Sequence, residues 1–277
     1  MPTSPDIALN NSVTIPQVGF GVFQVPPDET RQAVANALDA GYRHIDTAKI
    51  YGNEKAVGEA IKDSGVPREE IFVTTKCWNG DQGYDAALQA FDRSLSELGL
   101  EQLDLYLIHW PVPAKDQYVD TWKAFEKLYA DGRVRSIGVS NFQISHLERL
   151  FAETDVVPAV NQIELHPWLP QNELRDFHSV HGIATEAWSP IARGGDHLNN
   201  AILKGIAAAH GRSVAQVILR WHTQLGTIVL PRTVKAKRAV ENISLFDFEL
   251  SDREMRTIAS LSNGMRVGPN PDDFNAE

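Results

Sequence analysis

The chain has 277 residues, of which 43% are hydrophobic, and its formal net charge is −10 at pH 7. This length and apolar content are sufficient for one well-buried core, so we expect a single domain over residues 1–277. The negative charge argues against broad binding to nucleic acid or to anionic membranes, which leaves small molecules or other proteins as partners.

The sequence also limits the compartment and the metal content. The single cysteine, Cys77, cannot form an internal disulfide, and no group of cysteine and histidine residues has metal-ligand spacing. Residues 1–12 lack the basic region and apolar segment of a secretory leader, and no apolar run reaches about 18 residues. We therefore expect a cytoplasmic protein without a metal site, and a monomer, because the sequence indicates no apolar surface patch.

Eight short, apolar, β-branched runs alternate with longer segments whose apolar residues recur at helical spacing. The runs comprise residues 18–22, 44–47, 71–76, 103–109, 134–140, 158–165, 183–189 and 227–233. The helical segments include residues 29–41, 54–65, 84–100, 120–132 and 144–155, most of which end in glycine. Strict alternation predicts parallel strands joined by helical crossovers, and eight units favour an α/β fold of the (β/α)8, or TIM, barrel type. An open doubly wound sheet is the alternative.

Further elements are expected at both ends of the chain. The stretch IALNNSVTIP, residues 7–16, predicts a β-hairpin with its turn at Asn11 and Ser12, which we expect to cap the bottom of the barrel. Near the C-terminus, residues 213–226 and 251–264 predict extra helices.

Several predicted strands end in chemically active side chains. Asp46 ends the second strand, Lys76 the third and His109 the fourth, while Tyr51 lies in the loop after the second. Because the carboxyl ends of barrel strands share one face, we expect these four side chains to converge there. They suit protonation of a carbonyl oxygen, whereas the absence of a nucleophile paired with a base disfavours hydrolysis.

The expected electrostatics concern Tyr51. At about 4 Å and an effective dielectric near 20, an ammonium attracts a phenolate by roughly 4 kcal/mol, or about three pKa units. Lys76 should therefore lower the pKa of Tyr51 toward neutral pH, while Asp46 keeps Lys76 charged. His109 would then hydrogen-bond a substrate oxygen.

Each of these residues also has a structural interpretation when it is taken alone. His109 suits a satisfied core position, Lys76 a solvated strand end and Asp46 the cap of the next turn. Trp78 and Trp110, just past two strand ends, are expected either to pack or to form an apolar wall around a substrate.

A basic run in this acidic chain points to a cofactor. PRTVKAKR, residues 231–238, precedes a predicted helix, where cations are unfavourable unless an anion is bound. Its arginines suit a phosphate monoester, which favours a ligand with a 2′-phosphate, and a solvated basic face is the alternative. Trp188 could stack on a flat heterocycle. GFGVFQ, residues 19–24, lacks the third glycine of a Rossmann site, which is therefore not indicated.

Several long motifs match a known family in order and spacing. They are GYRHIDTAKIYGNE, VTTK, LDLYLIHWP, IGVSNF, PAVNQIELHP, WSP and PRTVKAKRAVEN. Through them nearly the whole chain resembles the aldo-keto reductases, and within these the bacterial 2,5-diketo-D-gluconate reductase-like members. The resemblance implies a (β/α)8 barrel and the metal-free, NADPH-dependent reduction of aldehydes, ketones and dicarbonyls, including keto sugars.

The resemblance also implies residue roles. The family's proton donor matches Tyr51, its supporting pair matches Asp46 and Lys76, and its substrate-orienting histidine matches His109. The implied cofactor contacts are Ser140, Asn141, Gln162, Trp188, Ser189, Arg232, Thr233, Val234, Arg238, Glu241 and Asn242. The implied substrate contacts are Phe23, Ile50, Trp78, His109 and Trp110.

Some positions depart from the family pattern. Arg232 stands where lysine is common, and Ile191 and Arg193 depart from the motif that follows the seventh strand. The tail, residues 266–277, is short, so we expect an open pocket and a broad choice of substrate.

Two rival functions remain at this stage. A Schiff-base aldolase or related lyase would use Lys76 as its nucleophile at a strand end. A non-catalytic nucleotide-binding subunit would sense the cofactor ratio and regulate a partner. The sequence does not specify the physiological substrate.

Overall fold

The computed structural model describes residues 4–276, and a sheet of eight parallel strands forms its centre. The strands are β3 (Phe20–Gly21), β4 (His44–Asp46), β5 (Phe72–Cys77), β6 (Leu103–Ile108), β7 (Val134–Ser140), β8 (Val160–Glu164), β9 (Ala184–Trp188) and β10 (Ile228–Val229). Each strand pairs with the next along the chain. All eight predicted strands are thus confirmed.

The first and last strands meet, which closes the sheet into a barrel. Val18 forms a parallel bridge with Val229. The amide of Gly19 donates to the Val229 carbonyl oxygen at 2.9 Å, and the amide of Gly21 donates to that of Pro231 at 3.2 Å. This closure confirms the predicted (β/α)8 barrel and excludes the open sheet. Both strands are shorter than predicted, because only a few residues pair regularly at the seam.

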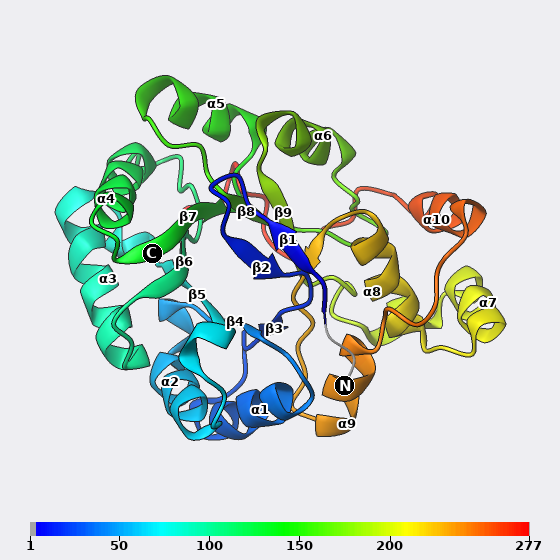
Figure 1. Ribbon diagram of the computed structural model, residues 1–277. Helices are drawn as coiled ribbons and strands as arrows, with labels where there is room; N and C mark the ends of the chain where they lie inside the picture. The colour runs from blue at the N-terminus through cyan, green and yellow to red at the C-terminus, as the bar shows by residue number, and fades with distance from the viewer. Residues whose placement is uncertain (1–3, 277) are drawn as a thin grey trace.

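Helices surround the strands (Figure 1). They are α1 (Pro27–Asp39), α2 (Glu54–Asp63), α3 (Tyr84–Leu98), α4 (Tyr118–Ala130), α5 (Ile144–Glu153), α6 (Asn172–His181), α7 (Ala201–His210), α8 (Val214–Gln224), α9 (Ala236–Ile243) and α10 (Asp252–Ala259). Short 3-10 helices occupy Lys49–Tyr51, Arg68–Glu70, Asn79–Asp81 and Gly195–Asn199. The predictions did not include α6 and α7, and α10 ends before the predicted residue 264.

The predicted N-terminal hairpin is present and caps the bottom of the barrel. Strands β1 (Asp6–Ala8) and β2 (Thr14–Pro16) pair antiparallel and cross in front of the barrel strands in Figure 1. Leu9 and Ile15 pack in one apolar cluster with barrel residues such as Phe72, at the start of β5. The hairpin therefore closes the amino-terminal end of the barrel.

The hairpin turn lies one residue earlier than predicted. The amide of Ser12 donates to the carbonyl oxygen of Leu9 at 3.0 Å, so Asn10 and Asn11 are the central residues of the turn. Ser12 follows with a φ of 67°, in the left-handed region. Asn11 is also tied to the barrel, because its Nδ2 donates to the carbonyl oxygen of Arg135 at 2.9 Å.

Two helical glycines offer a matched test of packing. A Cβ added at Gly58 in α2 would lie 2.1 Å from the carbonyl oxygen of Leu98, whereas one added at Gly205 in α7 would meet no atom within 4 Å. Gly205→Ala should raise the free energy of unfolding by about 0.5–1 kcal/mol, because alanine favours a helix. Gly58→Ala should lower it by about 2 kcal/mol, because α2 must move away from the end of α3. Urea unfolding measures both, and a Gly58→Ala variant as stable as wild type would contradict this close packing.

Within residues 4–276, no helix is both long and apolar enough to cross a membrane. The same residues contain no group of histidine, cysteine or acidic side chains arranged to hold a metal ion. Cys77 is buried.

Candidate active site

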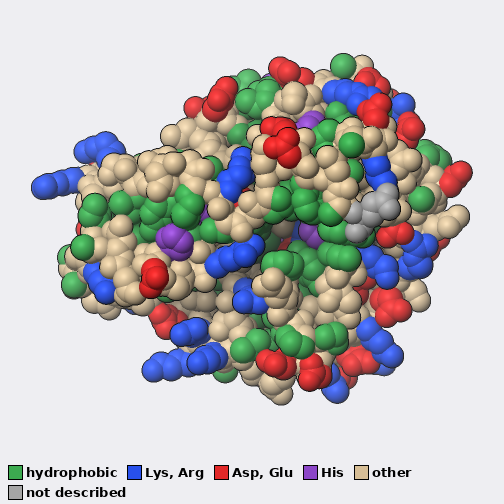
Figure 2. Space-filling view, turned by 180° about the vertical axis from the view of Figure 1, so that it is seen from behind, with side chains coloured by type: hydrophobic (Ala, Val, Ile, Leu, Met, Phe, Trp, Pro, Cys, Tyr) green, Lys and Arg blue, Asp and Glu red, His purple; other side chains and the backbone are tan. Residues whose placement is uncertain are grey.

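A cavity of about 410 Å³ lies at the carboxyl ends of the barrel strands. Trp78, His109 and Asn141 line it, and they directly follow β5, β6 and β7. This end is opposite to the hairpin. Figure 2 shows the molecule from behind, with a hollow near the middle of this face beside hydrophobic and basic side chains.

A larger depression of about 880 Å³ lies on the outside of the barrel, between α2 and the turn after α3. Many of its lining side chains are charged, and none of the predicted site residues lies there. The smaller cavity is therefore the candidate active site.

The cavity brings most of the predicted site residues together. Those that line it are Phe23, Asp46, Ile50, Tyr51, Trp78, His109, Trp110, Ser140, Asn141, Gln162, Trp188, Ser189 and Arg232. Lys76 is fully buried and does not line the cavity. The predicted cofactor residues outside the lining are Thr233, Val234, Arg238, Glu241 and Asn242.

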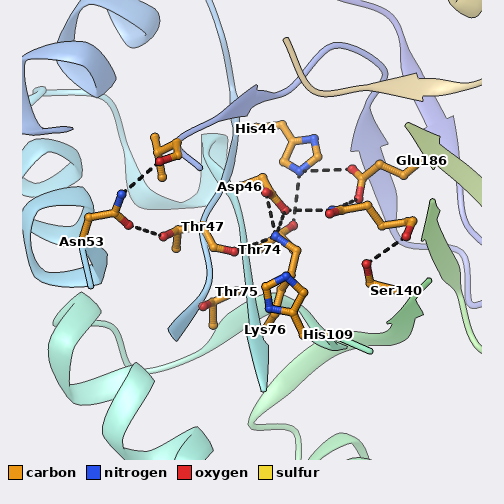
Figure 3. A network of polar contacts seen from close by, with 12 residues as sticks. His44, Asp46, Thr47, Asn53, Thr74, Thr75, Lys76, His109, Ser140 and Glu186 are labelled. Atoms are coloured by element: carbon orange, nitrogen blue, oxygen red, sulfur yellow. Dashed lines mark hydrogen bonds and ion pairs between the residues drawn. The ribbon is translucent and has the colours of Figure 1, made fainter. Parts of the chain in front are cut away.

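Lys76 and Asp46 form a buried ion pair between β5 and β4 (Figure 3). Nζ of Lys76 lies 2.7 and 2.8 Å from the two carboxylate oxygens of Asp46, and it also donates to the carbonyl oxygen of Thr47 at 2.8 Å. Burial alone lowers the pKa of Lys76, but Asp46 and Tyr51 more than reverse this effect, so the pKa is raised. Lys76 is therefore charged at neutral pH.

Tyr51 lies beside this ion pair, with Nζ of Lys76 5.2 Å from the centroid of its ring. The prediction that Lys76 lowers the pKa of Tyr51 toward neutral pH is wrong. Burial raises the pKa to about 12, because Lys76 offsets the loss of hydration only in part and Asp46 acts in the same direction as burial. Tyr51 therefore carries its proton at neutral pH, as a proton donor must.

His109 is a neutral imidazole at the cavity. Its ring packs edge-on against Tyr51 and Trp78, with centroid separations of 5.8 and 5.2 Å. Burial, together with the charge of Lys76, lowers the pKa of His109 well below 6.5. A neutral imidazole keeps one N–H donor, so His109 can hydrogen-bond an oxygen in the cavity without adding charge.

Polar side chains from three strands meet on another side of the cavity. Nε1 of Trp188 donates to Oδ1 of Asn141 at 2.8 Å, and Nδ2 of Asn141 donates to the carbonyl oxygen of His109 at 2.9 Å. Oγ of Ser140 donates to the carbonyl oxygen of Gln162 at 2.8 Å. These bonds hold Trp188 and Asn141 in fixed positions at the ends of β9 and β7.

The basic run lies next to the cavity. Arg232 lines the cavity, and its Nη1 donates to the carbonyl oxygen of Phe23 at 2.9 Å. Helix α9 begins at Ala236, and its N-cap residue is Lys235. The side chain of Lys235 accepts no hydrogen bond from the backbone amides of the first turn, so the helix has no side-chain N-cap. Arg238 is exposed in that turn. This arrangement of amides and cations suits an anion.

Comparison with known sequences now decides the family. A sequence model described as the Aldo/keto reductase family matches residues 17–263. The chain belongs to the aldo/keto reductase family. The resemblance seen in the sequence motifs is thereby confirmed, and the protein is an oxidoreductase of this family.

Named relatives of this aldo/keto reductase match it over almost their whole length. It is 59% identical over 272 residues to an aldo-keto reductase of Mycolicibacterium smegmatis, with 98% of each chain covered. It is 53% identical over 277 residues to the glyoxal reductase of Bacillus subtilis, with 99% of each chain covered. The crystal structure of a Gox0644 variant in complex with NADPH matches with a TM-score of 0.94, 47% identity and 98% of each chain covered.

Two buried polar residues of this aldo/keto reductase were missed in the sequence, Glu186 on β9 and His44 on β4. Figure 3 shows both near Asp46. Nε2 of Gln162 donates to Asp46 at 2.9 Å and to Glu186 at 2.7 Å, so one amide joins two carboxyl groups. The alternation of side chains along a strand could have identified them, because residues two apart face the same side. Glu186 stands two residues before Trp188, and His44 stands two residues before Asp46.

The C-terminal tail forms part of the cavity wall. Gly268, Pro269 and Phe274 line the cavity, and the rings of Phe274 and Trp110 lie 4.4 Å apart. The buried carboxylate of Glu164 holds the tail, because it accepts a hydrogen bond from the amide of Gly268 at 3.0 Å. The expectation that a short tail leaves the pocket open is therefore wrong on this side.

Proposed function

We propose that this protein reduces aldehydes, ketones or dicarbonyls, including keto sugars, to alcohols by hydride transfer from NADPH, with Tyr51 as the proton donor. The observation that carries the proposal is the protonated Tyr51 beside the buried Lys76–Asp46 pair at the cavity. Family membership, the glyoxal reductase relative and the NADPH-bound relative support the same reaction.

The residues present fit NADPH. Ser140, Asn141 and Gln162 offer polar atoms beside the cavity for a carboxamide, and the indole of Trp188 offers a flat surface for a nicotinamide ring. The first turn of α9, together with Arg232 and Arg238, suits a phosphate. When bound, NADPH supplies the hydride.

The side chains of the cavity divide the remaining work. The hydroxyl of Tyr51 gives its proton to the oxygen of the carbonyl group as negative charge develops there. The charge of Lys76 stabilises the phenolate that forms, and Asp46 keeps Lys76 charged. A ring N–H of His109 directs the carbonyl oxygen toward Tyr51.

The state of Lys76 argues against the Schiff-base lyase. Such a lyase needs an unprotonated amine that can reach its substrate. Lys76 is fully buried, its pKa is raised, and its ammonium contacts both oxygens of Asp46. Lys76 therefore suits the charged neighbour of a proton donor in a reductase better than the nucleophile of a lyase.

The walls of the cavity favour a broad choice of carbonyl compounds. Phe23, Trp78, Trp110 and Phe274 all line it and present aromatic surface. Aromatic walls discriminate weakly between apolar shapes, whereas a specific polar contact would discriminate strongly. We therefore expect small dicarbonyls and aromatic aldehydes to be reduced alongside keto sugars.

The preference for NADPH over NADH is tested at Arg238. Loss of a hydrogen bond to a charged group costs about 1.5–3 kcal/mol, so Arg238→Ala should raise the KM for NADPH roughly tenfold to a hundredfold. The KM for NADH, which lacks the 2′-phosphate, should change less than about twofold. Arg253→Ala, at an exposed arginine of α10, is the control and should change neither constant. Equal increases for the two cofactors would show that Arg238 does not contact the 2′-phosphate.

The function itself is tested by a steady-state screen of NADPH oxidation with glyoxal, aromatic aldehydes and keto sugars. We expect NADPH consumption matched by alcohol formation with at least one of these classes. Tight NADPH binding without turnover across the whole panel would instead support the non-catalytic nucleotide sensor.

A further inference from the structure

Glu186, on β9, is a fully buried carboxyl group that accepts a single hydrogen bond within residues 4–276. Its Oε2 accepts a hydrogen bond from Gln162, while Oε1 has no hydrogen-bond partner within residues 4–276. Nε2 of His44 lies 3.7 Å from Oε1. Burial lowers the pKa of His44 to about 3, so this imidazole is neutral and does not form an ion pair with Glu186.

The ammonium of Lys76 is hydrogen-bonded to Asp46 and not to Glu186. Both oxygens of Asp46 and the carbonyl oxygen of Thr47 surround Nζ within 2.8 Å. Two buried carboxyl groups, Asp46 and Glu186, thus share one cation. Burial and the charge of Asp46 raise the pKa of Glu186 to about 8, against the opposing effects of Gln162 and Lys76. Glu186 therefore holds a proton at neutral pH.

The groups that face Glu186 come from four strands. They are His44 and Asp46 on β4, Lys76 on β5, Gln162 on β8 and Ile228, its register partner on β10. At the cavity, burial keeps the pKa of His109 well below 6.5 and that of Tyr51 near 12. With a pKa of about 8, Glu186 changes charge between about pH 7 and pH 9.

We propose that Glu186 is a positioning residue for the carbonyl reduction proposed above, on which this inference rests, and that it acts as a neutral acid. It holds the amide of Gln162 between itself and Asp46, and its proton keeps a second negative charge away from Tyr51 and Lys76. Ionised Glu186 would make the hydroxyl of Tyr51 a weaker acid, so transfer of its proton would slow.

The Glu186→Gln variant separates the effect of charge from that of shape. The side-chain oxygen of the new glutamine still accepts a hydrogen bond from Gln162, but the amide group does not ionise. The rate of NADPH oxidation in a single turnover with glyoxal, measured from about pH 6.5 to 9.5, is the readout. In the wild type this rate should fall at least about threefold between pH 7 and 9, and in Glu186→Gln the fall should be absent. Glu54→Gln removes another buried carboxyl group of raised pKa, bonded to Thr75, and should keep the wild-type profile.

Thermal melting tests the protonation of Glu186 without any turnover. A carboxyl group whose pKa rises from 4.5 to about 8 on folding stabilises the protein below pH 4.5, and this contribution is lost as the pH rises through 8. The melting temperature of Glu186→Gln relative to wild type should therefore increase from about pH 6 to pH 9.

Glu186→Leu tests the positioning role, because it removes the acceptor for Gln162. It should weaken NADPH binding at least about fivefold at every pH, whereas Glu186→Gln should bind NADPH normally. Two results would overturn the neutral-acid role. One is a single-turnover rate that depends on pH in the same way in wild type and Glu186→Gln. The other is a difference in melting temperature between the two proteins that stays constant from about pH 6 to pH 9. Normal NADPH binding by Glu186→Leu would overturn the positioning role. Failure of the proposed reaction itself would differ from all of these, because the wild type would not oxidise NADPH.

Discussion

The Tyr51→Phe variant should lose almost all carbonyl reduction and still bind NADPH normally. Phenylalanine keeps the ring that packs against Phe23 and His109, with centroids 5.1 and 5.8 Å away, but removes the hydroxyl proton. General acid catalysis contributes typically about 10²–10⁴-fold, so we expect kcat to fall roughly 10³-fold. The dissociation constant for NADPH, measured by fluorescence titration, should stay within about twofold of wild type, because binding of the cofactor does not require this proton.

Tyr84→Phe is the matched control for the loss of a hydroxyl group. Tyr84 begins α3, is 41% exposed and does not line the cavity, so its variant should keep wild-type kcat. If Tyr51→Phe retains more than about a tenth of the wild-type rate, Tyr51 is not the proton donor.

Lys76→Met should strongly reduce activity and also destabilise the protein. Removing one partner of a buried ion pair typically costs about 3–5 kcal/mol, because Asp46 would be left as an uncompensated buried charge. The rate of carbonyl reduction should fall at least about 10²-fold, because the phenolate of Tyr51 loses its neighbouring cation. Urea unfolding and single-turnover kinetics measure the two effects separately.

A double variant separates the structural role of this pair from its role in the reaction. Lys76→Met combined with Asp46→Asn removes both charges, so it should recover most of the stability that the single variant loses. It should recover none of the rate, because no cation then stabilises the phenolate. A double variant with restored stability and restored activity would show that the ion pair serves the fold alone.

The barrel was predictable because its pattern repeats along the whole chain. Buried parallel strands appear as continuous apolar runs, and residues 103–109 and 134–140 correspond closely to β6 (Leu103–Ile108) and β7 (Val134–Ser140). The seam was harder to predict, because residues 18–22 and 227–233 were each predicted as a strand over their whole length, whereas only two residues of each form regular strand. Backbone pairing there depends on how the barrel closes, which no local pattern reports.

The position of the catalytic candidates was also predictable, because the end of a barrel strand fixes the face on which a residue lies. The ionisation of Tyr51 was not. The sequence indicates a neighbouring ammonium but not the extent of burial, and burial decides the direction in which the pKa moves. Phe274 was missed for a similar reason, since the tail reaches Trp110 only through folding of the irregular chain after α10.

The most direct test of the proposed chemistry follows an isotope label from cofactor to product. Wild-type protein is supplied with glyoxal and with NADPH that carries deuterium at both C4 positions, in ordinary water, and the product is analysed by mass spectrometry. We predict one deuterium on the new alcohol carbon of every product molecule, with NADPH consumed in equal amount. A product without deuterium, or substrate trapped on Lys76 by borohydride with no NADPH consumed, would contradict hydride transfer at this site.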